Sequence, residues 1–390
     1  MRVIALGGAG NMGRPAVRAL AGSELVTAVV IADKDLAAAE QLAAEIGAKA
    51  SARAVDAGSE DQLAAVMAEG HLVINTCGPF FKFGATAVRA AIRAERNYCD
   101  INDDWRPTHQ VLALDSAAKN AGIVAIVGIG ASPGLSNLMA KHAVAQLDTV
   151  DEIQTCWLAD AQGEVQDEGH GGEHVNAALE HLMYSWSGRF PTFSDGRAVE
   201  VDAQEPGLAV TTPGGAVRTL YHVGHPEPVT LPRFISGVRT VANLGGLFPP
   251  QLNDLARQQA QRVSAGGISP RAAALAFLAG VMSEPERWLA RGDAGPASGL
   301  WVVAYGRKAG RRVRYACELA TSAADMGTST GRPLALAALK ILRGEIRQRG
   351  VLPPEAALDP MPFFNELTRL GPTPLVTGGS PLIESSRPLD

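Results

Sequence analysis

Gly8-Ala9-Gly10-Asn11-Met12-Gly13 is the stretch of sequence that decides the fold of the N-terminal region. It follows a strand candidate at residues 2–6, which is apolar after Arg2, and opens an alanine-rich helical segment at residues 12–21. A GxGxxG stretch between a strand and a helix is typical of a dinucleotide-binding βαβ unit, in which a pyrophosphate lies at the N-terminus of the helix. We expect the first glycine to form the tight turn, the second to leave space for the pyrophosphate, and the third to let helix and strand pack closely.

The alternation of apolar strands and helices continues as far as residue 130. Further strand candidates lie at residues 25–32, 50–55, 72–75, 97–101 and 123–127, with helical segments near residues 36–46, 60–68, 83–94 and 109–120 between them. Strands separated by helices of this length predict βαβ units and a parallel sheet that is buried on both faces. The predicted fold class is therefore α/β, with a Rossmann doubly wound parallel sheet whose ligand lies outside the carboxyl ends of the strands.

The pattern of the chain changes after residue 130. Strands and turns dominate residues 190–242, and a strand pair is expected at residues 300–305 and 311–320. Helical segments occur before, between and after these strands. This mixture predicts a second α+β domain with a mixed sheet.

Composition and charge exclude several classes of protein. The 390 residues carry 35 basic and 40 acidic side chains, a net charge of −5, so no positive field suits a general nucleic-acid binder or a polybasic membrane ligand. No apolar run approaches the ~18–20 residues that span a bilayer, and the N-terminus lacks the long apolar segment of a signal peptide. The four cysteines lie far apart, without metal-binding spacing. We therefore expect a cytoplasmic protein with reduced thiols and a small-molecule substrate.

Asp33 is the first candidate cofactor ligand outside the glycine stretch. It ends the second strand about 20 residues beyond Gly13, where a carboxylate binds the ribose diol of a dinucleotide. NAD is the expected cofactor, because a carboxylate repels a 2′-phosphate. Lys34 could attract that phosphate, so NADP stays open. Asp56 ends the third strand and either approaches the adenine side or caps a helix.

The loops after the fourth and fifth strands should lie at the same edge of the sheet. Thr76-Cys77-Gly78-Pro79 follows the fourth strand, where a doubly wound sheet offers backbone to the nicotinamide half of the cofactor. We expect Cys77 to be a small buried apolar residue rather than a nucleophile. Tyr98 and Asp100 end the fifth strand. Asp100 could hold a substrate ammonium or take a proton, or it could cap the loop that follows.

Five stretches of this sequence resemble the saccharopine dehydrogenase-like oxidoreductases, the group that includes saccharopine reductase, lysine 6-dehydrogenase and carboxynorspermidine dehydrogenase. They are residues 7–13, residues 73–80 (VINTCGPF), residues 97–101 (NYCDI), residues 130–138 (GASPGLSNL) and residues 350–355 (GVLPPE). The resemblance implies NAD(P)-linked chemistry at the carbon–nitrogen bond of an amino acid, opine or polyamine, commonly in a homodimer. It also implies cofactor contacts at the positions that match the family: Gly8, Gly10, Asn11, Met12, Gly13, Asp33, and Thr76 to Pro79.

The resemblance also implies a domain organisation. Residues 1–130 form the NAD(P)-binding Rossmann domain, and residues 131–330 form the substrate-binding and dimerisation domain. Residues 331–370 contain a C-terminal helix that returns to the Rossmann domain. Residues 371–390 are a tail whose end we expect to be frayed.

Oxidation of an amine removes a hydride from carbon and needs a base for the nitrogen-bound proton. His222 and His225 form the densest group of suitable side chains, although both could instead be loop histidines satisfied by backbone. Arg233 or Arg239 could clamp a substrate carboxylate. Together with Asp100, the two histidines are the candidate catalytic residues.

Four further residues are candidate substrate contacts besides Tyr98 and the two arginines. They are Pro133 and Gly134 in the turn after residue 130, and His170 and His174 in a glycine-rich loop. The spacing of the two histidines matches a zinc-protease pattern, but two intervening glycines disfavour the helix that the pattern requires, by roughly 1 kcal/mol each. We expect no metal site there.

Two other classes of function stay open. An enzyme with tightly bound NAD could oxidise an amine, exchange or cyclise it, and reduce the product again, as a cyclodeaminase or a homospermidine-synthase-like transferase does. A non-enzymatic protein could bind a dinucleotide as a sensor. Residues 160–250 match the characterised subfamilies least well, so the sequence does not identify the substrate.

Overall fold

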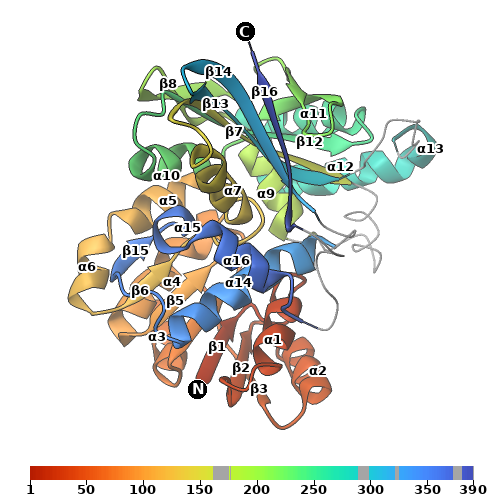
Figure 1. Ribbon diagram of the computed structural model, residues 1–390. Helices are drawn as coiled ribbons and strands as arrows, with labels where there is room; N and C mark the ends of the chain where they lie inside the picture. Colours follow the sequence, from red (N-terminus) through yellow and green to blue (C-terminus); the bar gives the residue numbers. More distant parts are fainter. Residues whose placement is uncertain (161–174, 176, 289–297, 321–324, 372–379, 390) are drawn as a thin grey trace. The chain divides into compact units, whose positions relative to one another are not determined.

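The computed structural model describes residues 1–160, 175, 177–288, 298–320, 325–371 and 380–389 (Figure 1). The chain forms two compact units. Unit 1 comprises Met1–Leu138 and Ala320–Pro381, and unit 2 comprises Met139–Leu319 and Leu382–Asp390. Each unit is therefore built from two separate parts of the chain.

Unit 1 contains a seven-stranded sheet whose strands are ordered β15-β6-β5-β4-β1-β2-β3. Every neighbouring pair in it is parallel. This is the doubly wound α/β arrangement, and the predicted fold class is confirmed. The strands are β1 (Arg2–Leu6), β2 (Ala28–Asp33), β3 (Ala50–Ala54), β4 (Leu72–Asn75), β5 (Asn97–Asp100), β6 (Val124–Ile126) and β15 (Gly350–Leu352).

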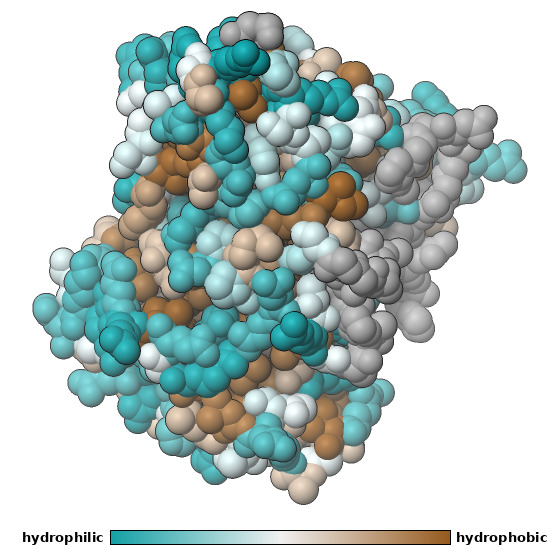
Figure 2. Space-filling model, in the orientation of Figure 1, coloured by the Kyte–Doolittle hydropathy of each residue, from teal (hydrophilic) through white to brown (hydrophobic). Residues whose placement is uncertain are grey.

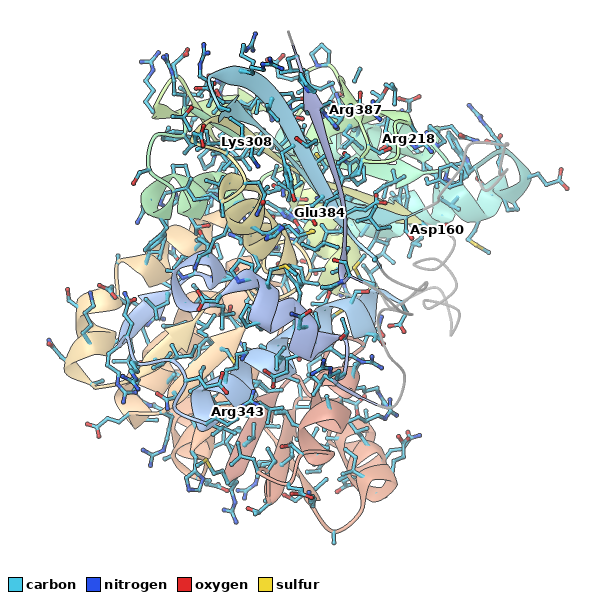
Figure 3. All side chains as sticks on the ribbon, in the orientation of Figure 1. Asp160, Arg218, Lys308, Arg343, Glu384 and Arg387 are labelled. Carbon is cyan, nitrogen blue, oxygen red and sulfur yellow. The ribbon has the colours of Figure 1, made fainter. Side chains whose placement is uncertain are left out.

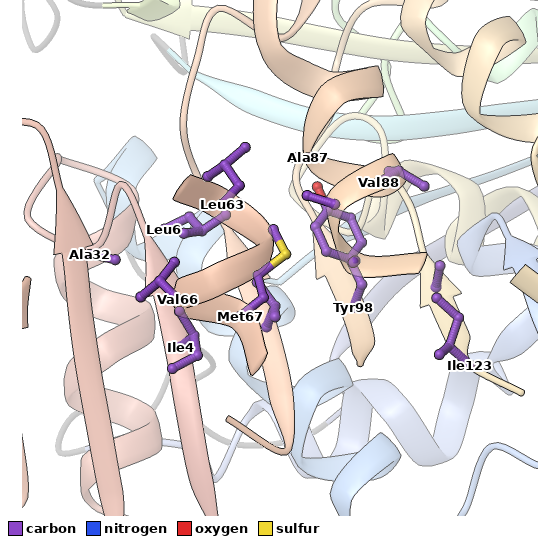
Figure 4. Close-up of a cluster of buried hydrophobic side chains, with 14 of the residues drawn as sticks. Ile4, Leu6, Ala32, Leu63, Val66, Met67, Ala87, Val88, Tyr98 and Ile123 are labelled. Atoms are coloured by element: carbon purple, nitrogen blue, oxygen red, sulfur yellow. The ribbon is translucent and has the colours of Figure 1, made fainter. Parts of the chain in front are cut away.

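Helices pack on this sheet and bury its apolar side chains. They are α1 (Gly13–Ala21), α2 (Leu36–Ile46), α3 (Glu60–Ala68), α4 (Phe80–Ala94), α5 (Trp105–Leu112), α6 (Asp115–Asn120), α14 (Met326–Leu342), α15 (Pro354–Ala357) and α16 (Pro360–Leu367). One core cluster joins Ile4 and Leu6 to Val66, Met67 and Tyr98 (Figure 4). Each such side chain stabilises the fold by roughly 1.5–3 kcal/mol relative to its exposed state.

Unit 2 is built on a mixed sheet in which strands are ordered β10-β11-β12-β7-β13-β14-β16, with β8 beside β12 and β9 beside β8. Only β12 and β7 are parallel neighbours among the described strand pairs of this sheet. The predicted mixed sheet is therefore confirmed. The strands are β7 (Thr149–Asp160), β8 (Arg189–Ser194), β9 (Arg197–Asp202), β10 (Leu208–Thr211), β11 (Val217–His222), β12 (Thr240–Phe248), β13 (Gly299–Lys308), β14 (Arg311–Leu319) and β16 (Leu382–Pro388).

Helices of unit 2 include one that the sequence analysis missed. Residues 190–242 were expected to hold only strands and turns, but α10 (Glu227–Phe234) interrupts them. Pro228 lies in its first turn, where a missing N–H is harmless, whereas Pro232 lies inside the helix and disguises it in the sequence. The remaining helices are α7 (Leu135–Val144), which crosses from unit 1 into unit 2, α9 (Ala177–Ser185), α11 (Leu252–Ser264), α12 (Pro270–Ser283) and α13 (Pro285–Trp288).

The C-terminus also differs from the expectation of a frayed tail. Leu382–Pro388 forms the edge strand β16, antiparallel to β14 (Figure 3). Glu384 of this strand accepts a hydrogen bond from the Tyr315 hydroxyl and lies 2.6 Å from Nε2 of His142. A ladder of backbone bonds and two side-chain contacts thus hold a segment whose short polar sequence gives no strand signal.

The visible surface is largely hydrophilic, with scattered apolar side chains between the polar ones (Figure 2). The most exposed large apolar residues, Met282 and Val217, belong to α12 and β11. Among the described residues, no helix combines the length and the hydropathy that a membrane span requires.

Candidate functional site

The order of strands reverses beside β1 in unit 1, because β2 lies on one side of β1 and β4 on the other. In open α/β sheets, a ligand binds outside the carboxyl ends of the strands at this point. The glycine turn, residues 7–12, lies there between β1 and α1. The structure thus brings the GxGxxG stretch to the edge where a dinucleotide would bind.

Gly7, rather than Gly8, has the left-handed backbone conformation of the turn, with φ of 67°. Its carbonyl accepts the Gly10 amide at 3.0 Å. A Cβ atom at Gly7 would lie only 2.8 Å from the Cys77 nitrogen, so the glycine lets the loop after β4 approach the turn. Gly8 is the second residue of the turn that the bond between Gly7 and Gly10 closes, and a Cβ there would lie 3.0 Å from the Ala5 carbonyl oxygen.

Gly13 and Gly10 have the contrasting surroundings that their expected roles require. A Cβ at Gly13 would lie 2.4 Å from the Gly7 carbonyl oxygen, so helix and turn leave no room for a side chain. A Cβ at exposed Gly10 would meet only that oxygen, at 3.3 Å. No described side chain caps the start of α1, and its first turn holds no acidic residue. The turn therefore fits a pyrophosphate, which would accept hydrogen bonds from the helix N-terminus.

Asp33 lies at the end of β2 and is bonded to the glycine turn. Its Oδ2 accepts the amide of Ala9 at 3.2 Å, and its Oδ1 accepts the amide of Asp35 at 3.1 Å. The side chain is 9% exposed, so its direction is fixed. Lys34 beside it is exposed. Asp56 is exposed as well and accepts the Gly58 amide in the turn before α3. The N-cap of α3 is Ser59, so the N-cap alternative for Asp56 is wrong.

The loop after β4 is attached to the same turn. The Thr76 hydroxyl lies within hydrogen-bonding distance of the carbonyls of Leu6 (3.1 Å) and Gly7 (2.9 Å). The Cys77 amide donates to Asn75 Oδ1. Burial, reinforced by the charge of Asp33, raises the pKa of the Cys77 thiol to about 12. The thiol is therefore neutral near pH 7, which fits a packing role.

Asp100 ends a buried hydrogen-bonded chain. Asn75 Nδ2 donates to the Tyr98 hydroxyl at 2.8 Å, and that hydroxyl donates to Asp100 Oδ2 at 2.9 Å. The other carboxylate oxygen accepts the amides of Asn102 and Gly128 at 3.0 and 2.8 Å. Burial raises the pKa of Asp100 to about 6, although these hydrogen bonds offset part of the effect. The carboxylate joins the loops after β5 and β6.

Pro133 and Gly134 form a tight turn after β6. A Cβ at Gly134, where φ is 125°, would lie 2.1 Å from the Gly130 oxygen. The Gly134 amide donates to Asn137 Oδ1, and Asn137 Nδ2 donates to Glu355 Oε2 at 2.9 Å. Glu355 belongs to the GVLPPE stretch, so this buried contact gives that stretch a structural role that the sequence did not reveal.

Helix α14 contacts the glycine turn, and this contact was not predicted from the sequence. Helices α14 and α1 pack side by side (Figure 1). A Cβ at Gly327 would lie 2.7 Å from the Asn11 carbonyl oxygen, and one at Gly331 would lie 2.5 Å from that of Met12. The spacing of four residues places both glycines on one helix face. The GTSTG sequence of residues 327–331 was a signal of a small helix face, but the glycine turn that this face contacts is more than 300 residues away in the sequence.

A second group of polar side chains lies in unit 2 and contains His225. Its Nε2 lies 3.0 Å from Nε2 of His181, on α9, and its Nδ1 lies 3.6 Å from Oε2 of Glu227, on α10. His225 is 5% exposed and Glu227 is fully buried. We call His181, His225, Glu227 and Asn243 the histidine cluster.

Asn243, on β12, fixes the carboxylate of the cluster. Its Nδ2 lies 2.9 Å from both Glu227 Oε1 and Thr155 Oγ1, and its Oδ1 accepts the Trp157 indole N–H at 3.2 Å. The Trp157 ring also stacks on His225, with centroids 6.1 Å apart. The cluster therefore combines side chains from two helices, one strand and a loop.

The other residues proposed for the substrate do not join the cluster through any contact found in the described part of the chain. His222 lies half-buried on β11, and burial lowers its pKa. Arg233 is exposed at the end of α10, and exposed Arg239 pairs with Asp195 at 3.5 Å. His170 and His174 lie outside the described residues.

Residues 3–126 match the model of the saccharopine dehydrogenase NADP binding domain. The resemblance noted in the sequence is thereby confirmed, and so is an NAD(P)-type cofactor.

Two full-length proteins are similar to the whole chain. A carboxyaminopropylagmatine dehydrogenase of Synechocystis sp. is 25% identical over 402 aligned positions, which cover 95% of this chain and 96% of that protein. Apo saccharopine dehydrogenase (L-Glu forming) of Saccharomyces cerevisiae has the same fold, with a TM-score of 0.68, 16% identity and 99% coverage of each chain. All three comparisons support the expected class of protein, an NAD(P)-dependent dehydrogenase.

Proposed function

We propose that the protein is an NAD(P)-dependent dehydrogenase that acts on the CH–NH bond of a secondary amine, in which an amino-acid carboxylate and an amine or polyamine chain are joined. The observation that carries this proposal is the glycine turn with Asp33 beside it in a domain of the saccharopine dehydrogenase type. The substrate class is supported by the full-length relative, whose name describes an agmatine with a carboxyaminopropyl substituent.

In the oxidative direction, the proposed reaction converts a secondary amine into an amine and a carbonyl compound. A C–H bond next to nitrogen is lost as hydride, the nitrogen loses a proton to a base, and a C=N bond forms. Water then converts the imine into an amine and a carbonyl compound. The bound nicotinamide supplies the hydride acceptor, or the donor in the reverse direction.

The residues of unit 1 serve the cofactor in this proposal. Gly10 and the N-terminus of α1 hold the pyrophosphate, Asp33 accepts the ribose hydroxyls, and residues 76–79 offer backbone to the nicotinamide half. We expect NAD to bind better than NADP, because the fixed carboxylate of Asp33 repels a 2′-phosphate. Both carboxylate oxygens of Asp100 accept protein donors that join two loops, so we assign Asp100 to positioning of these loops and keep His225 as the candidate proton acceptor.

The decisive experiment follows the absorbance of reduced nicotinamide with purified protein. NAD and NADP are each tested with basic amino acids, polyamines and opine-like secondary amines, and the reduced cofactors with amines plus 2-oxo acids or aldehydes. Turnover of a secondary amine that bears a carboxylate, with NAD favoured, is the expected result. Silence in every combination, with NADH binding detected by fluorescence, would overturn the proposal and favour a bound-cofactor transferase or a non-enzymatic binder.

The assembly is also part of the proposal. We expect a homodimer in the cytoplasm, as the family resemblance implies. Light scattering of the purified protein, with and without NADH, measures the mass directly. A monomer at micromolar concentration would contradict the dimer without affecting the proposed reaction.

A further inference from the structure

Asn75, the last residue of β4, is fully buried and forms hydrogen bonds in two directions. Its Oδ1 accepts the Cys77 amide at 2.9 Å, and its Nδ2 donates to the Tyr98 hydroxyl at 2.8 Å. The first bond closes an Asx-turn, which bends the chain directly after the strand. The second bond fixes the orientation of the amide, because the Tyr98 hydroxyl gives its single hydrogen to Asp100 and accepts one from Asn75.

Tyr98 and Asp100 connect this amide to the neighbouring strand, β5. Tyr98 is fully buried, and its hydroxyl lies 2.9 Å from Asp100 Oδ2. Oδ1 of Asp100 accepts the amides of Asn102 and Gly128, which lie in the loops after β5 and β6. A chain of buried hydrogen bonds therefore links the loop after β4 to the two loops that follow the next strands of the sheet.

The glycine turn holds the same loop from the other side. The Thr76 hydroxyl lies 2.9 Å from the Gly7 carbonyl oxygen, and a Cβ at Gly7 would lie only 2.8 Å from the Cys77 nitrogen. The turn and the loop therefore contact each other through their backbones. Because the pyrophosphate is expected at the turn, these contacts fix the loop relative to the expected path of the cofactor.

The loop leaves backbone polar groups for a ligand between these two attachments. Within the described residues, no group accepts the Gly78 N–H or donates to the Cys77 carbonyl oxygen, and both residues are partly exposed. A carboxamide carries one acceptor oxygen and two donor hydrogens, so it can bind an N–H and a carbonyl at once. The nicotinamide ring bears such a carboxamide.

We propose that Asn75 is a positioning residue for the nicotinamide half of the cofactor, acting through the backbone of Cys77 and Gly78, with Tyr98 as its support. The inference rests on the proposed placement of the nicotinamide at residues 76–79 and needs no statement about the substrate. Asn75 touches no ligand itself. It holds the loop in the bound conformation before the cofactor arrives, so that binding does not have to order the loop.

The test compares two ligands of the full-length protein, NADH and ADP-ribose, which lacks the nicotinamide ring. Asn75→Ala should raise the Kd for NADH about 10-fold and the Kd for ADP-ribose less than about 2-fold, because the ring alone depends on the held loop. Calorimetric titration measures both constants. An equal loss for the two ligands would show a general defect in the domain and would overturn the inference, as would no loss for either.

Tyr98→Phe tests the support while leaving the bond between Asn75 and Cys77 in place. It removes one oxygen and retains the packed ring, so the inference stays testable if Asn75→Ala does not fold. NADH should bind about 3-fold more weakly, again with little change for ADP-ribose. Adding Tyr98→Phe to Asn75→Ala should cause no further loss, because both substitutions break one chain. Fully additive losses would mean that Tyr98 acts independently and would overturn the chain.

Asn97 offers a matched control at the opposite end of the same sheet. Its Oδ1 accepts the Val124 amide at 2.9 Å, where β5 and β6 begin. Asn97→Ala therefore also removes a hydrogen bond from a side chain to the backbone. It should leave the ratio of the two Kd values unchanged even if the melting temperature falls. A changed ratio in this variant would reduce the effect of Asn75 to a loss of stability and overturn its positioning role.

None of these measurements contains an amine, so their outcome is separate from that of the turnover experiment. A protein that loses NADH affinity selectively in Asn75→Ala but oxidises no amine would reject the proposed reaction and retain the positioning role. A protein that oxidises the amine with NAD, but whose Asn75→Ala variant keeps the wild-type Kd for NADH, would retain the reaction and overturn the inference.

Discussion

Six consecutive residues form the glycine turn of unit 1, whereas side chains from α9, α10, β12 and the loop after β11 form the histidine cluster of unit 2. The turn presents backbone groups, and its glycines leave the space that a ligand and a packed helix need. The cluster presents imidazole and carboxylate groups whose positions depend on Asn243. A backbone site is therefore sensitive to added atoms, and a side-chain site is sensitive to lost partners.

Gly10→Val is the substitution in the glycine turn for which we expect the largest effect. The added side chain should occupy the pyrophosphate path and raise the Kd for NADH at least 100-fold, about 2.7 kcal/mol. The thermal midpoint of the free protein should barely change, because a Cβ at Gly10 meets only the Gly7 oxygen, at 3.3 Å. Fluorescence titration and a melting curve measure the two effects.

Gly22→Ala is the matched control for loss of a glycine. Gly22 lies just past the other end of α1, and a Cβ there makes ordinary contacts at 3.5 and 3.6 Å. It should bind NADH like the wild type. Wild-type affinity in Gly10→Val would show that the pyrophosphate does not pass this turn.

Asn243→Ala tests the other half of the comparison. The substitution removes the donor to Glu227 Oε1 and the acceptor of the Trp157 indole, which leaves buried polar groups with fewer partners. We expect a loss of about 2–3 kcal/mol in the free energy of unfolding. Urea unfolding measures it, with exposed Asn120→Ala as the control that should change stability by less than about 0.5 kcal/mol. An unchanged unfolding curve would mean that the cluster is not held by its hydrogen bonds.

The same difference between the two sites explains which of their residues could be predicted from the sequence. The glycine turn, its flanking strand and helix, and Asp33 lie within 33 residues of the N-terminus, and their spacing alone identified the dinucleotide edge. Gly7 was missed because the backbone of Cys77, which leaves no room for a Cβ at Gly7, is distant in sequence. The face of α14 that carries Gly327 and Gly331 was missed for the same reason.

The histidine cluster could be predicted only in part. His225 was selected because histidines crowd near it in the sequence, and that criterion selected His222 equally. Only packing distinguishes them: His225 meets His181 and Glu227, whereas His222 is a strand residue on β11. No local pattern connects His181 with Asn243, because their separation of 62 residues contains a helix and several strands that differ in length.

Asp33→Asn examines the one side chain on which the backbone site depends. The amide oxygen can still accept one of the two backbone N–H groups that Asp33 binds, while the NH2 group faces the other, and the charge that repels a 2′-phosphate is removed. With exposed Lys34 close by, the ratio of NADP to NAD affinity should rise about 10-fold, or about 1.4 kcal/mol. Asp35→Asn, two residues on, makes the same charge change at the cap of α2 and should leave the ratio unchanged. An equal shift in both variants would indicate a general field rather than ribose recognition.

Asp100 gives a smaller effect that depends on pH. Its folded pKa of about 6 lies above the ordinary 3.8, so the native state holds this proton more tightly than the unfolded chain does. The resulting stabilisation is complete below pH ~4 and is lost as pH rises through 6, by about 1 kcal/mol between pH 5 and 8. The melting midpoint of the wild type relative to Asp100→Asn should therefore fall by about 2–4 °C over that interval.

The control for Asp100 is Asp61→Asn, because the Asp61 side chain is 91% exposed. Its midpoint relative to the wild type should not vary between pH 5 and 8. A constant difference for Asp100→Asn as well would mean that the carboxylate is ionised throughout this range, held by Asn102, Gly128 and Tyr98.

Cys77→Ala is the mildest test, and it asks whether the loop after β4 acts through backbone alone. With its pKa raised to about 12, the thiol is almost never ionised at pH 7 and makes a poor nucleophile. We expect kcat/KM for the amine to change less than about 2-fold, and alkylation of Cys77 to be far slower than that of an ordinary thiol with pKa of about 8.5. A loss of 100-fold or more with NADH affinity intact would give this loop a reacting side chain. The contrast between a backbone-built edge in unit 1 and a side-chain cluster in unit 2 would then no longer hold.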